Sequence, residues 1–547
     1  MSNLDLYRQP DDSNPQSLDF VHSLFSQPVA PKLDELTNSP HELTTDDQVP
    51  LILVPPAKNE RDYLFIGGYY MPLSKAEGHT LLVGASGSGK SKLTYPAIAH
   101  ACSTLSPGNG LVVIFDVKGD MYPLADYFAK KQEVPLHYFN ATDARSNVWD
   151  IAKDADGYID VLNELIHILL PAGDARDPFW IQGAQAVGMA VALSLIKTKG
   201  TDWGLHDLYN ACFSDLEKLV EFLRHNSTNE PVIERVLESE AEKATAGILM
   251  QLSVVLQSMR LAAAQQYHTP KEQWVSLKEV VDKGGIMVIG QKPTSRASTT
   301  PLMRAMFKRL SDIILDLPEY THPPTYIYID EFAYLGKQLP GIMDLLTFSR
   351  SKRCQVYLTV QNIDQLRENY GTHGAESIVS NCEFQVILRA GSVETAHWAS
   401  RLCGQERTLQ PSFSRNAGGF SQNWSFVTRE RLLADEFRML PRASRLNGLH
   451  FVFISPYSGV VRTHLPPDMV DELTPPKSNT PARINIAAHR FDLPRWNPNL
   501  SVEKKVSPMG REEYVRQGES ELERAIRHHV WQLFEDMSET AMYDFLS

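Results

Sequence analysis

The sequence predicts an α/β protein built on a doubly wound parallel sheet, with an all-α block inserted between the early and late strands. The first observation is a set of short apolar runs bounded by Gly and Pro, which are typical of buried parallel strands: LFIGG, HTLLVGA and GLVVIFDV. The second is a change to helical spacing of the apolar residues from about residue 154 to residue 268. The third is the return of strand-like runs after that block, in GGIMVIG, TYIYIDEF, CQVYLTV, CEFQVILRA and HFVFIS.

These changes divide the chain into five segments. Residues 1–60 are rich in Pro, Ser, Asn and Asp, and we expect a loosely ordered arm there. Residues 61–153 carry the first strands, residues 154–280 form the all-α domain, and residues 281–470 carry the remaining strands. Residues 471–547 form a polar extension that ends in an amphipathic helix. The apolar stripe of that helix comprises Leu522, Ile526, Val530, Leu533 and Met537.

Two local features carry further structural expectations. The stretch SFSRNAGGFSQNWSF (412–426) is rich in Gly, Ser and Asn, and it predicts a mobile loop. The five cysteines are scattered without a CxxC pair, so we expect small buried thiols rather than a zinc site or a disulfide framework.

The length and the net charge of the chain limit the classes of protein to which it could belong. A chain of 547 residues is too long for one ordinary core. No continuous apolar run approaches the roughly 18–20 residues of a membrane helix, and no signal peptide is visible, so we expect a cytoplasmic protein without an intrinsic transmembrane segment. The net charge of −13 argues against coating DNA with the whole surface. Contact with nucleic acid would therefore be confined to a pore or one face.

A phosphate-binding loop follows the second apolar run. The stretch from Gly84 to Ser91 matches GxxxxGK[ST] between a strand and a helix, the context in which backbone N–H groups and a helix N-terminus face phosphate oxygens. Lys90 is expected to reach the β- and γ-phosphates, and the Ser91 hydroxyl is expected to hold Mg²⁺. A chance Gly/Ser-rich turn is the alternative. The predicted cradle comprises Gly84, Ala85, Ser86, Gly87, Ser88, Gly89, Lys90 and Ser91.

A pair of acids ends a later strand. Asp330 and Glu331 follow the apolar run TYIYI, and ligands of open α/β sheets bind at the carboxyl ends of strands. Asp330 is expected to position Mg²⁺, and Glu331 to polarise the attacking water as a general base. The alternative is a solvated pair at a turn. Adjacent acids without an NKxD-type guanine motif favour ATP as the nucleotide. Gln361, at the end of the next strand, is either a γ-phosphate contact or a simple strand cap.

Several stretches together resemble the type IV secretion coupling ATPases, the TraG/TraD-type conjugation proteins of the FtsK–HerA superfamily. The resemblance covers roughly residues 60–465, and DEFAxLG and the arginine-rich stretch leading to Gln361 are its most specific parts. The matching stretches, in chain order, are HTLLVGASGSGKSKLTYPAI, FDVKGDMYPLADYF, DPFWIQGAQAV, IDEFAYLG, SRSKRCQVYLTVQNIDQLRENYG and IVSNCEFQVILRAG. Within DVKGD, Lys118 has no role that the sequence predicts.

The resemblance implies a RecA-like ATPase core and a homo-oligomeric, usually hexameric, ring. Its Walker residues carry over to Lys90, Ser91, Asp330 and Glu331, and its γ-phosphate-sensing glutamine to Gln361. Rings of this type complete each site with an arginine from the neighbouring subunit, which supplies about 10³–10⁵ in rate. Arg350 and Arg353 are the candidates, against the alternative of an ordinary basic helix end. Arg389 and Arg401 are the weaker alternatives.

The resemblance also implies partners. Coupling proteins connect DNA–relaxase complexes, or protein effectors, to a secretion channel, whereas most of them begin with transmembrane helices. The polar start of this chain departs from that pattern. We therefore expect recruitment to the inner face of the membrane by a separate adaptor protein.

Two other functions remain open from the sequence. One is a soluble HerA- or FtsK-like DNA translocase that acts in repair or in the maintenance of mobile elements. The other is a protein-recruitment platform that uses the ATPase core mainly as a scaffold. A relaxase that co-purifies with the chain would favour the coupling function, and a nuclease partner would favour the translocase.

Overall fold

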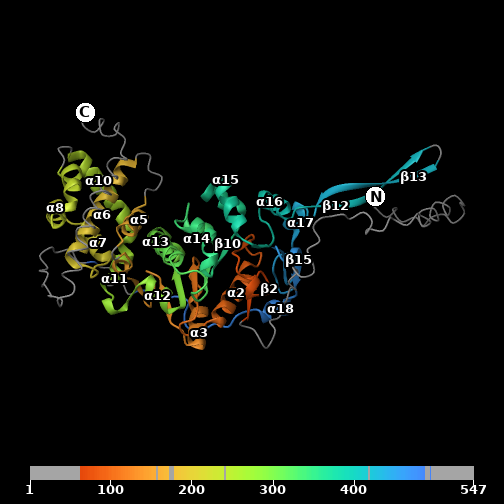
Figure 1. The fold of residues 1–547 in the computed structure, drawn as a ribbon, viewed down its shortest axis with the longest axis horizontal. Coiled ribbons are helices and arrows are strands. Elements are labelled where there is room, and N and C mark those ends of the chain that lie inside the picture. The colour runs from red at the N-terminus through yellow and green to blue at the C-terminus, as the bar shows by residue number, and fades with distance from the viewer. Residues whose placement is uncertain are drawn as a thin grey trace, which may run out of the picture. The chain divides into compact units, whose positions relative to one another are not determined.

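The computed structural model describes residues 62–155, 158–171, 178–238, 242–416, 419–486 and 493. These residues all belong to one compact unit that spans Leu51–Ser547 (Figure 1). The predicted N-terminal arm (1–60) and the predicted C-terminal amphipathic helix lie outside the described residues.

A nine-stranded sheet is the centre of this unit. Its strand order is β15-β14-β11-β3-β10-β9-β4-β8-β5, and the seven strands from β11 to β5 are all parallel. At one edge, β14 pairs antiparallel with β11, and β15 pairs antiparallel with β14. The strand bounds are β3 Thr80–Val83, β4 Leu111–Asp116, β5 Leu136–Phe139, β8 Gly285–Gly290, β9 Thr325–Ile329, β10 Cys354–Val360, β11 Phe384–Ile387, β14 Leu449–Ser455 and β15 Gly459–Leu465.

Helices on both faces bury the parallel strands. Every residue of β3, β4, β8 and β9 is buried, which explains why these strands are nearly continuous apolar runs. Helices α2 and α3 pack together against β4, β5 and β8, whereas α13, α14, α15 and α16 follow one another on the opposite face (Figure 1). The bounds are α2 Lys90–Thr104, α3 Tyr122–Gln132, α13 Arg296–Leu315, α14 Ile342–Phe348, α15 Ile363–Asn381, α16 Val393–Cys403, α17 Ala434–Met439 and α18 Pro467–Glu472.

An all-helical region interrupts the sheet between β5 and β8. The short parallel strands β6 (Val148–Trp149) and β7 (Trp274–Val275) pair where the chain leaves and re-enters the sheet domain. The predicted fold class, a doubly wound sheet with an inserted all-α block, is thus confirmed, while the boundaries at 154 and 280 stay predictions. The helices are α4 Ile151–Ala155, α5 Ile159–Leu169, α6 Pro178–Lys199, α7 Leu205–Cys212, α8 Leu216–Leu223, α9 Glu230–Val232, α10 Glu242–Leu256, α11 Arg260–Tyr267 and α12 Leu277–Lys283.

Two helical stretches of this region are longer and more apolar than the sequence analysis allowed. Pro178–Lys199 and Glu242–Tyr267 both have the length and composition of a membrane-spanning helix. The most apolar part of α6 is 67% buried inside the helical region, as in the core helix of a helical domain, and the corresponding part of Glu242–Tyr267 is 33% buried.

The structure corrects three expectations about strands. The stretch LFIGG lies in β1 (Tyr63–Ile66), which pairs with β2 (Tyr69–Pro72) in a separate antiparallel hairpin and not in the main sheet. HFVFIS lies in β14, which is antiparallel to its neighbours. The expected mobile loop at 412–426 is wrong, because β12 (Gln405–Asn416) and β13 (Gly419–Glu430) form a long antiparallel ribbon there. The ribbon is held together by backbone hydrogen bonds, which do not depend on apolar side chains. A stretch rich in Ser, Asn and Gly therefore gave no strand signal in the sequence.

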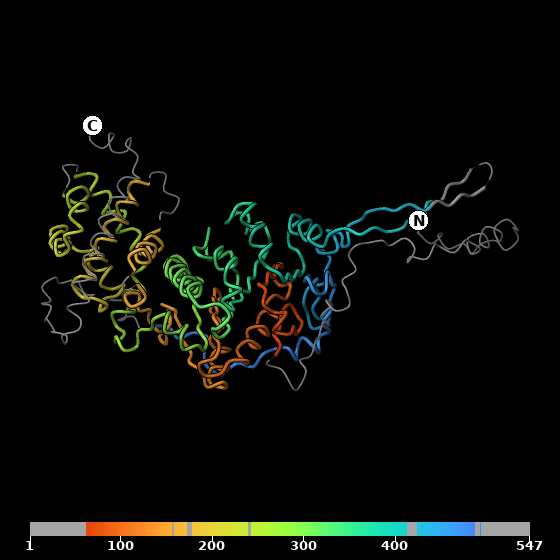
Figure 2. The backbone as a smooth tube through the Cα atoms, in the orientation of Figure 1, coloured from red at the N-terminus to blue at the C-terminus, as the bar shows by residue number. Residues whose placement is uncertain are grey.

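After α18 the chain turns back along the sheet domain. Figure 2 shows this segment in blue beside the orange α3. The contact is direct, because Ser478 N donates to Pro123 O at 2.9 Å. The cysteine expectation is confirmed, since all five cysteines are free and buried.

Candidate nucleotide site

The carboxyl ends of four neighbouring parallel strands converge at one edge of the sheet. Strands β3, β10, β9 and β4 are adjacent, so the segments that follow them meet there. These segments are the glycine-rich loop 84–89 after β3, Gln361 after β10, the acid pair after β9 and the turn 117–121 after β4. Residues far apart in the chain are therefore brought to one place, as expected for an open α/β sheet.

The glycine-rich loop is held between two strands and wraps around Lys90. Gly84 N donates to Val360 O at 3.1 Å, and Ala85 N donates to Arg389 O at 3.0 Å. Gly89 adopts φ +105° directly before α2, a backbone conformation that favours glycine. The Lys90 ammonium, in a side chain that is 7% exposed, donates to Gly84 O at 2.7 Å. This is the predicted phosphate cradle, opening at a helix N-terminus.

The two acids after β9 are buried and bound together by one threonine. Glu331 N donates to Oγ1 of Thr359 at 2.8 Å, and that hydroxyl donates to Oδ1 of Asp330 at 3.1 Å. Glu331 has φ +56°, an uncommon conformation for a side chain with a Cβ, which places strain at this position. The hydroxyl thus holds the Asp330 carboxylate and the Glu331 backbone N–H in defined places, although the backbone at Glu331 is strained.

Two lysines balance the charge of the two acids. Lys118 Nζ lies 2.8 Å from Oδ2 of Asp330 and 3.6 Å from Oε1 of Glu331. Lys90 Nζ lies 3.7 Å from the same Glu331 oxygen. Burial lowers the pKa of Lys90 against the opposing pull of Glu331. For Lys118, burial is outweighed by the Asp330 and Glu331 carboxylates, and its pKa is raised.

Asp116 organises the turn that carries Lys118. Its carboxylate accepts hydrogen bonds from Gly119 N at 2.6 Å and Met121 N at 2.9 Å. Burial raises the pKa of Asp116 to about 7, while these backbone N–H groups favour the ionised form.

A cavity of about 580 Å³ opens over this edge. The glycine-rich loop, Lys118 and Glu331 line one side, and a segment from the end of the sheet domain lines the other. Lys477 of that segment places Nζ 4.7 Å from the ring centre of Tyr95. The remaining lining residues on that side are Ala443, Thr474 and Pro475.

The predicted site residues fall into two places. Lys90, Ser91, Asp330 and Glu331 come together at the carboxyl edge, and Gln361 follows β10 there, half-buried, without lining the cavity. Their roles stay predictions. The predicted cradle residues Ala85, Ser86, Gly87, Gly89, Lys90 and Ser91 line the cavity.

The arginines lie elsewhere. Arg350 and Arg353 precede β10, at the amino end of a strand of seven residues, roughly 23 Å from its carboxyl end. Arg350 pairs with Glu77 and Glu383, and Arg353 donates to His322 O, so neither reaches the site of its own chain. Arg389 instead lies beside the loop and lines an adjoining hollow with Ser86, while Arg401 is exposed on α16.

Sequence reasoning missed several contributors. Thr359 lies within a mostly apolar buried strand, and only its position two residues before Gln361 hinted at a role. Lys118 stood in a matched stretch, DVKGD, but nothing in the sequence pointed to its ion pairs. Nothing in the sequence indicated that Thr474, Pro475 and Lys477 line the cavity, because they reach it only when the chain after α18 turns back along the sheet domain.

The donors at this edge fit a nucleotide with Mg²⁺. Hydroxyl and carboxylate oxygens of Ser91 and Asp330 are the hard ligands that Mg²⁺ prefers. Ser88 Oγ is buried in the loop and has no hydrogen-bond partner in the part of the chain that the structure describes. Among the described residues, no group of three or more His, Cys, Asp or Glu side chains could hold a metal ion.

Comparison with known proteins points in one direction. The family of type IV secretion-system coupling protein DNA-binding domains matches residues 63–446. Two curated proteins of Escherichia coli, both called conjugal transfer protein TraG, are 23% identical to this chain over 412 and 399 residues. The alignments take in 69% and 66% of this chain but only 63% and 62% of the relatives' length.

Solved structures share the fold. The unbound bacterial conjugative coupling protein TrwBdeltaN70 matches with a TM-score of 0.62 at 19% identity, over 80% of this chain and 97% of that one. The plasmid coupling protein TrwB in complex with ADP and Mg²⁺ matches with a TM-score of 0.60 at 20% identity, over 80% and 97%. TrwB with the ATP analogue ADPNP matches with a TM-score of 0.60 at 19% identity, over 80% and 98%.

Proposed function

This chain belongs to the type IV secretion coupling protein family, and from that premise we propose that it hydrolyses ATP to bring a DNA–relaxase complex, or a protein substrate, to a secretion channel. The observation that carries the ATPase part is the meeting of Lys90, Asp330 and Glu331 at the carboxyl edge of the sheet beside one cavity, with Thr359 and Lys118 holding the acids. The TrwB structures with ADP and Mg²⁺, with ADPNP and with the GTP analogue GDPNP support a nucleoside triphosphate at this site. The DNA-binding domain of the matching family, with the conjugal transfer proteins among the relatives, supports a DNA cargo.

In this proposal each residue has one task. The backbone N–H groups of residues 84–90 and the Lys90 ammonium bind the β- and γ-phosphates. Glu331 takes a proton from the attacking water, and Thr359 keeps its carboxylate in place through the Glu331 N–H. When bound at Ser91 and Asp330, Mg²⁺ neutralises charge on the phosphate oxygens. Gln361 contacts the γ-phosphate.

We extend the proposal to the assembly. A ring of copies, six as in the family resemblance, brings an arginine of one copy to the cavity of the next. Arg350 is 54% exposed at the opposite edge of the sheet, which leaves it accessible to a neighbouring copy. An adaptor protein holds the ring at the inner face of the membrane.

The test is ATP hydrolysis by the full chain with and without DNA. We expect measurable turnover that DNA increases and that Lys90→Ala abolishes. Turnover that DNA leaves unchanged would remove the DNA-directed part, and a wild-type chain that does not hydrolyse ATP would remove the enzyme. Affinity capture from the native cell then separates the cargo classes, since a relaxase supports coupling and a nuclease supports a repair translocase.

A further inference from the structure

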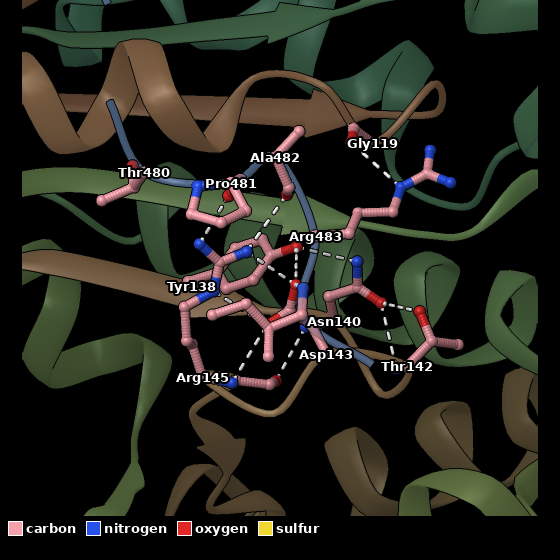
Figure 3. A network of polar contacts seen from close by, with 12 residues as sticks. Gly119, Tyr138, Asn140, Thr142, Asp143, Arg145, Thr480, Pro481, Ala482 and Arg483 are labelled. Atoms are coloured by element: carbon pink, nitrogen blue, oxygen red, sulfur yellow. Dashed lines mark hydrogen bonds and ion pairs between the residues drawn. The ribbon is translucent and has the colours of Figure 1, made fainter. Parts of the chain in front are cut away.

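Residues 474–486, which follow α18, form a return segment that touches both the nucleotide cavity and the loop 140–147, which in turn contacts the helical region. At its start, Thr474, Pro475 and Lys477 line the cavity. Further on, Ser478 N donates to Pro123 O, and the segment passes along α3. At its end it reaches the turn 117–121 and the loop 140–147 (Figure 3).

Arg483 of this segment donates hydrogen bonds to the turn that carries Lys118. Its Nε donates to Gly119 O at 3.1 Å, and its Nη2 donates to Lys118 O. A guanidinium is suited to this task because its donors form a rigid fork. Gly119 has φ +72°, and a Cβ there would lie 2.6 Å from Nη2 of Arg483, so the close approach requires a glycine.

The turn is therefore held from both sides. Asp116 accepts the N–H groups of Gly119 and Met121, and Arg483 donates to the carbonyls of Lys118 and Gly119. The Lys118 side chain leaves this turn toward the acids and ends 2.8 Å from Asp330. Any shift of the turn is a shift of the ammonium relative to Asp330 and Glu331.

The return segment has its own attachment next to Arg483. Ile484 N donates to Oδ2 of Asp143, and Ala144 N donates to Ile484 O, both at 2.9 Å. The Arg145 guanidinium donates to Pro481 O at 2.8 Å and Ala482 O at 3.1 Å (Figure 3). The backbone around Arg483 is thus held by contacts with the loop 140–147, and these contacts are separate from those that Arg483 makes with the 117–121 turn.

That attachment also reaches the helical region. Gln265 of α11 donates to the backbone carbonyl of Asp143 at 3.3 Å, and Arg145 lies over the ring of Tyr122 at 3.7 Å from its centre. A continuous set of contacts therefore runs from α11 through the Asp143 loop and Arg483 to the Lys118 turn.

We propose that Arg483 is a positioning residue for ATP hydrolysis: it holds the 117–121 turn so that Lys118 stays on Asp330 and Glu331. The inference rests on the proposed ATPase function for its kinetic consequence, but the placement of Lys118 is independent of turnover. Arg483 touches only backbone carbonyls of the turn, so its effect passes through Lys118.

Two variants of the full chain test this, Arg483→Ala and Arg483→Lys, with Arg145→Ala as the matched comparison. Arg145→Ala also removes a guanidinium from carbonyl oxygens, those of the return segment itself. It leaves in place both donations of Arg483 to the Lys118 turn and the two backbone hydrogen bonds of Ile484 that hold the segment. We expect kcat to fall about tenfold in Arg483→Ala, which corresponds to the loss of about 1.4 kcal/mol of transition-state stabilisation. The Kd for ATP should stay within threefold of the wild-type value. Arg483→Lys recovers part of kcat, because one ammonium reaches one carbonyl. Arg145→Ala changes kcat less than threefold.

A second readout does not need turnover. Acetylation of Lys118 by acetic anhydride, followed by peptide mass spectrometry, reports whether its ammonium is held by the acids. We expect Lys118 to react at least threefold faster in Arg483→Ala than in wild type, and at the wild-type rate in Arg145→Ala. Unchanged Lys118 reactivity in Arg483→Ala would overturn the inference, as would an equal fall of kcat in Arg145→Ala. A wild-type chain without ATPase activity would remove the proposed function, while the labelling would still decide where Arg483 holds Lys118.

Discussion

Lys118 and Asp330 form an ion pair across two neighbouring strands, with Nζ and Oδ2 separated by 2.8 Å. Lys118 follows β4 by two residues, whereas Asp330 directly follows β9, so the pair links the two turns at the carboxyl edge. With Lys90 near Glu331, two ammonium groups offset two buried carboxylates before a nucleotide binds. Each charge of the site therefore has a counter-charge whose removal has a measurable consequence.

Replacing Lys118 with methionine keeps the stem and removes the charge. Asp330 and Glu331 then lose their nearest cation, and we expect a loss of about 1 kcal/mol of unfolding free energy, kept small because Lys118 is 38% exposed. Mg²⁺ with ATP supplies replacement positive charge and should restore more stability than in wild type. Thermal unfolding in EDTA and in Mg²⁺–ATP measures both. An unchanged Tm in EDTA would show that the ion pair contributes nothing.

Replacing Thr359 with valine removes the hydroxyl that joins the two acids. The buried Glu331 N–H loses its acceptor, which costs about 1–3 kcal/mol. We expect kcat to fall about tenfold while the Kd for ATP changes little, since Thr359 holds the acids and not the phosphates. Thr359→Ser keeps the hydroxyl and is the control. A valine variant with wild-type kcat would contradict the positioning of Glu331 by this side chain.

Two glycines of the phosphate-binding loop differ in what surrounds them. A Cβ on Gly89 would lie 2.3 Å from Leu449 Cδ1 and 2.9 Å from Ala443 Cβ, whereas one on Gly87 would have no described atom within 4 Å. Both have positive φ, so Gly87→Ala costs about 1–2 kcal/mol for the backbone alone. Gly89→Ala adds roughly 1–3 kcal/mol of overpacking. Urea unfolding of the two variants compares them, and equal losses would argue against the close packing around Gly89.

His79 predicts a pH dependence of stability. Burial lowers its pKa to about 4, and the neutral ring accepts from Val356 N at 3.0 Å while its Nε2 faces Leu346 O at 3.0 Å. Between pH 6.5 and 4 the unfolded chain binds a proton that the folded chain does not. The free energy of unfolding therefore falls as pH falls through this window, by about 3 kcal/mol in total.

Chemical denaturation at pH 7, 5.5 and 4.5 measures this dependence. His79→Gln keeps one donor and one acceptor but has no proton to take up, so its stability should change less over the same range. Equal slopes for wild type and His79→Gln would show that His79 titrates normally in the folded chain.

The sequence identified the parts of the fold that long apolar runs encode. Strands β4, β8 and β9 are buried on both faces, so nearly every residue of them is apolar and the pattern is plain. The β12–β13 ribbon was missed because its pairing comes from backbone hydrogen bonds between Ser-, Asn- and Gly-rich stretches. The place of β3 between β10 and β11 depends on long-range pairing that local patterns do not carry.

The site shows the same division. Lys90 and the two acids after β9 could be found from the sequence, because each lies in a local motif. Lys90 lies in a glycine-rich loop between a strand and a helix, and the acids directly follow an apolar strand. Lys118, Thr359 and Arg483 act through contacts between segments that only the folded chain brings together. Arg389, ranked below Arg350 and Arg353, lies beside the glycine-rich loop because β11 neighbours β3.

Turnover and binding of ATP by Glu331→Gln test the central claim most directly. Glutamine keeps the size of Glu331 and its N–H to Thr359 but cannot take a proton from water. We expect Glu331→Gln to bind ATP as the wild type does and to turn it over about 10³-fold more slowly, which corresponds to about 4 kcal/mol of barrier, whereas Lys90→Ala should fail to bind ATP. A Glu331→Gln variant that hydrolyses ATP at the wild-type rate would contradict the assignment of this edge as the catalytic site.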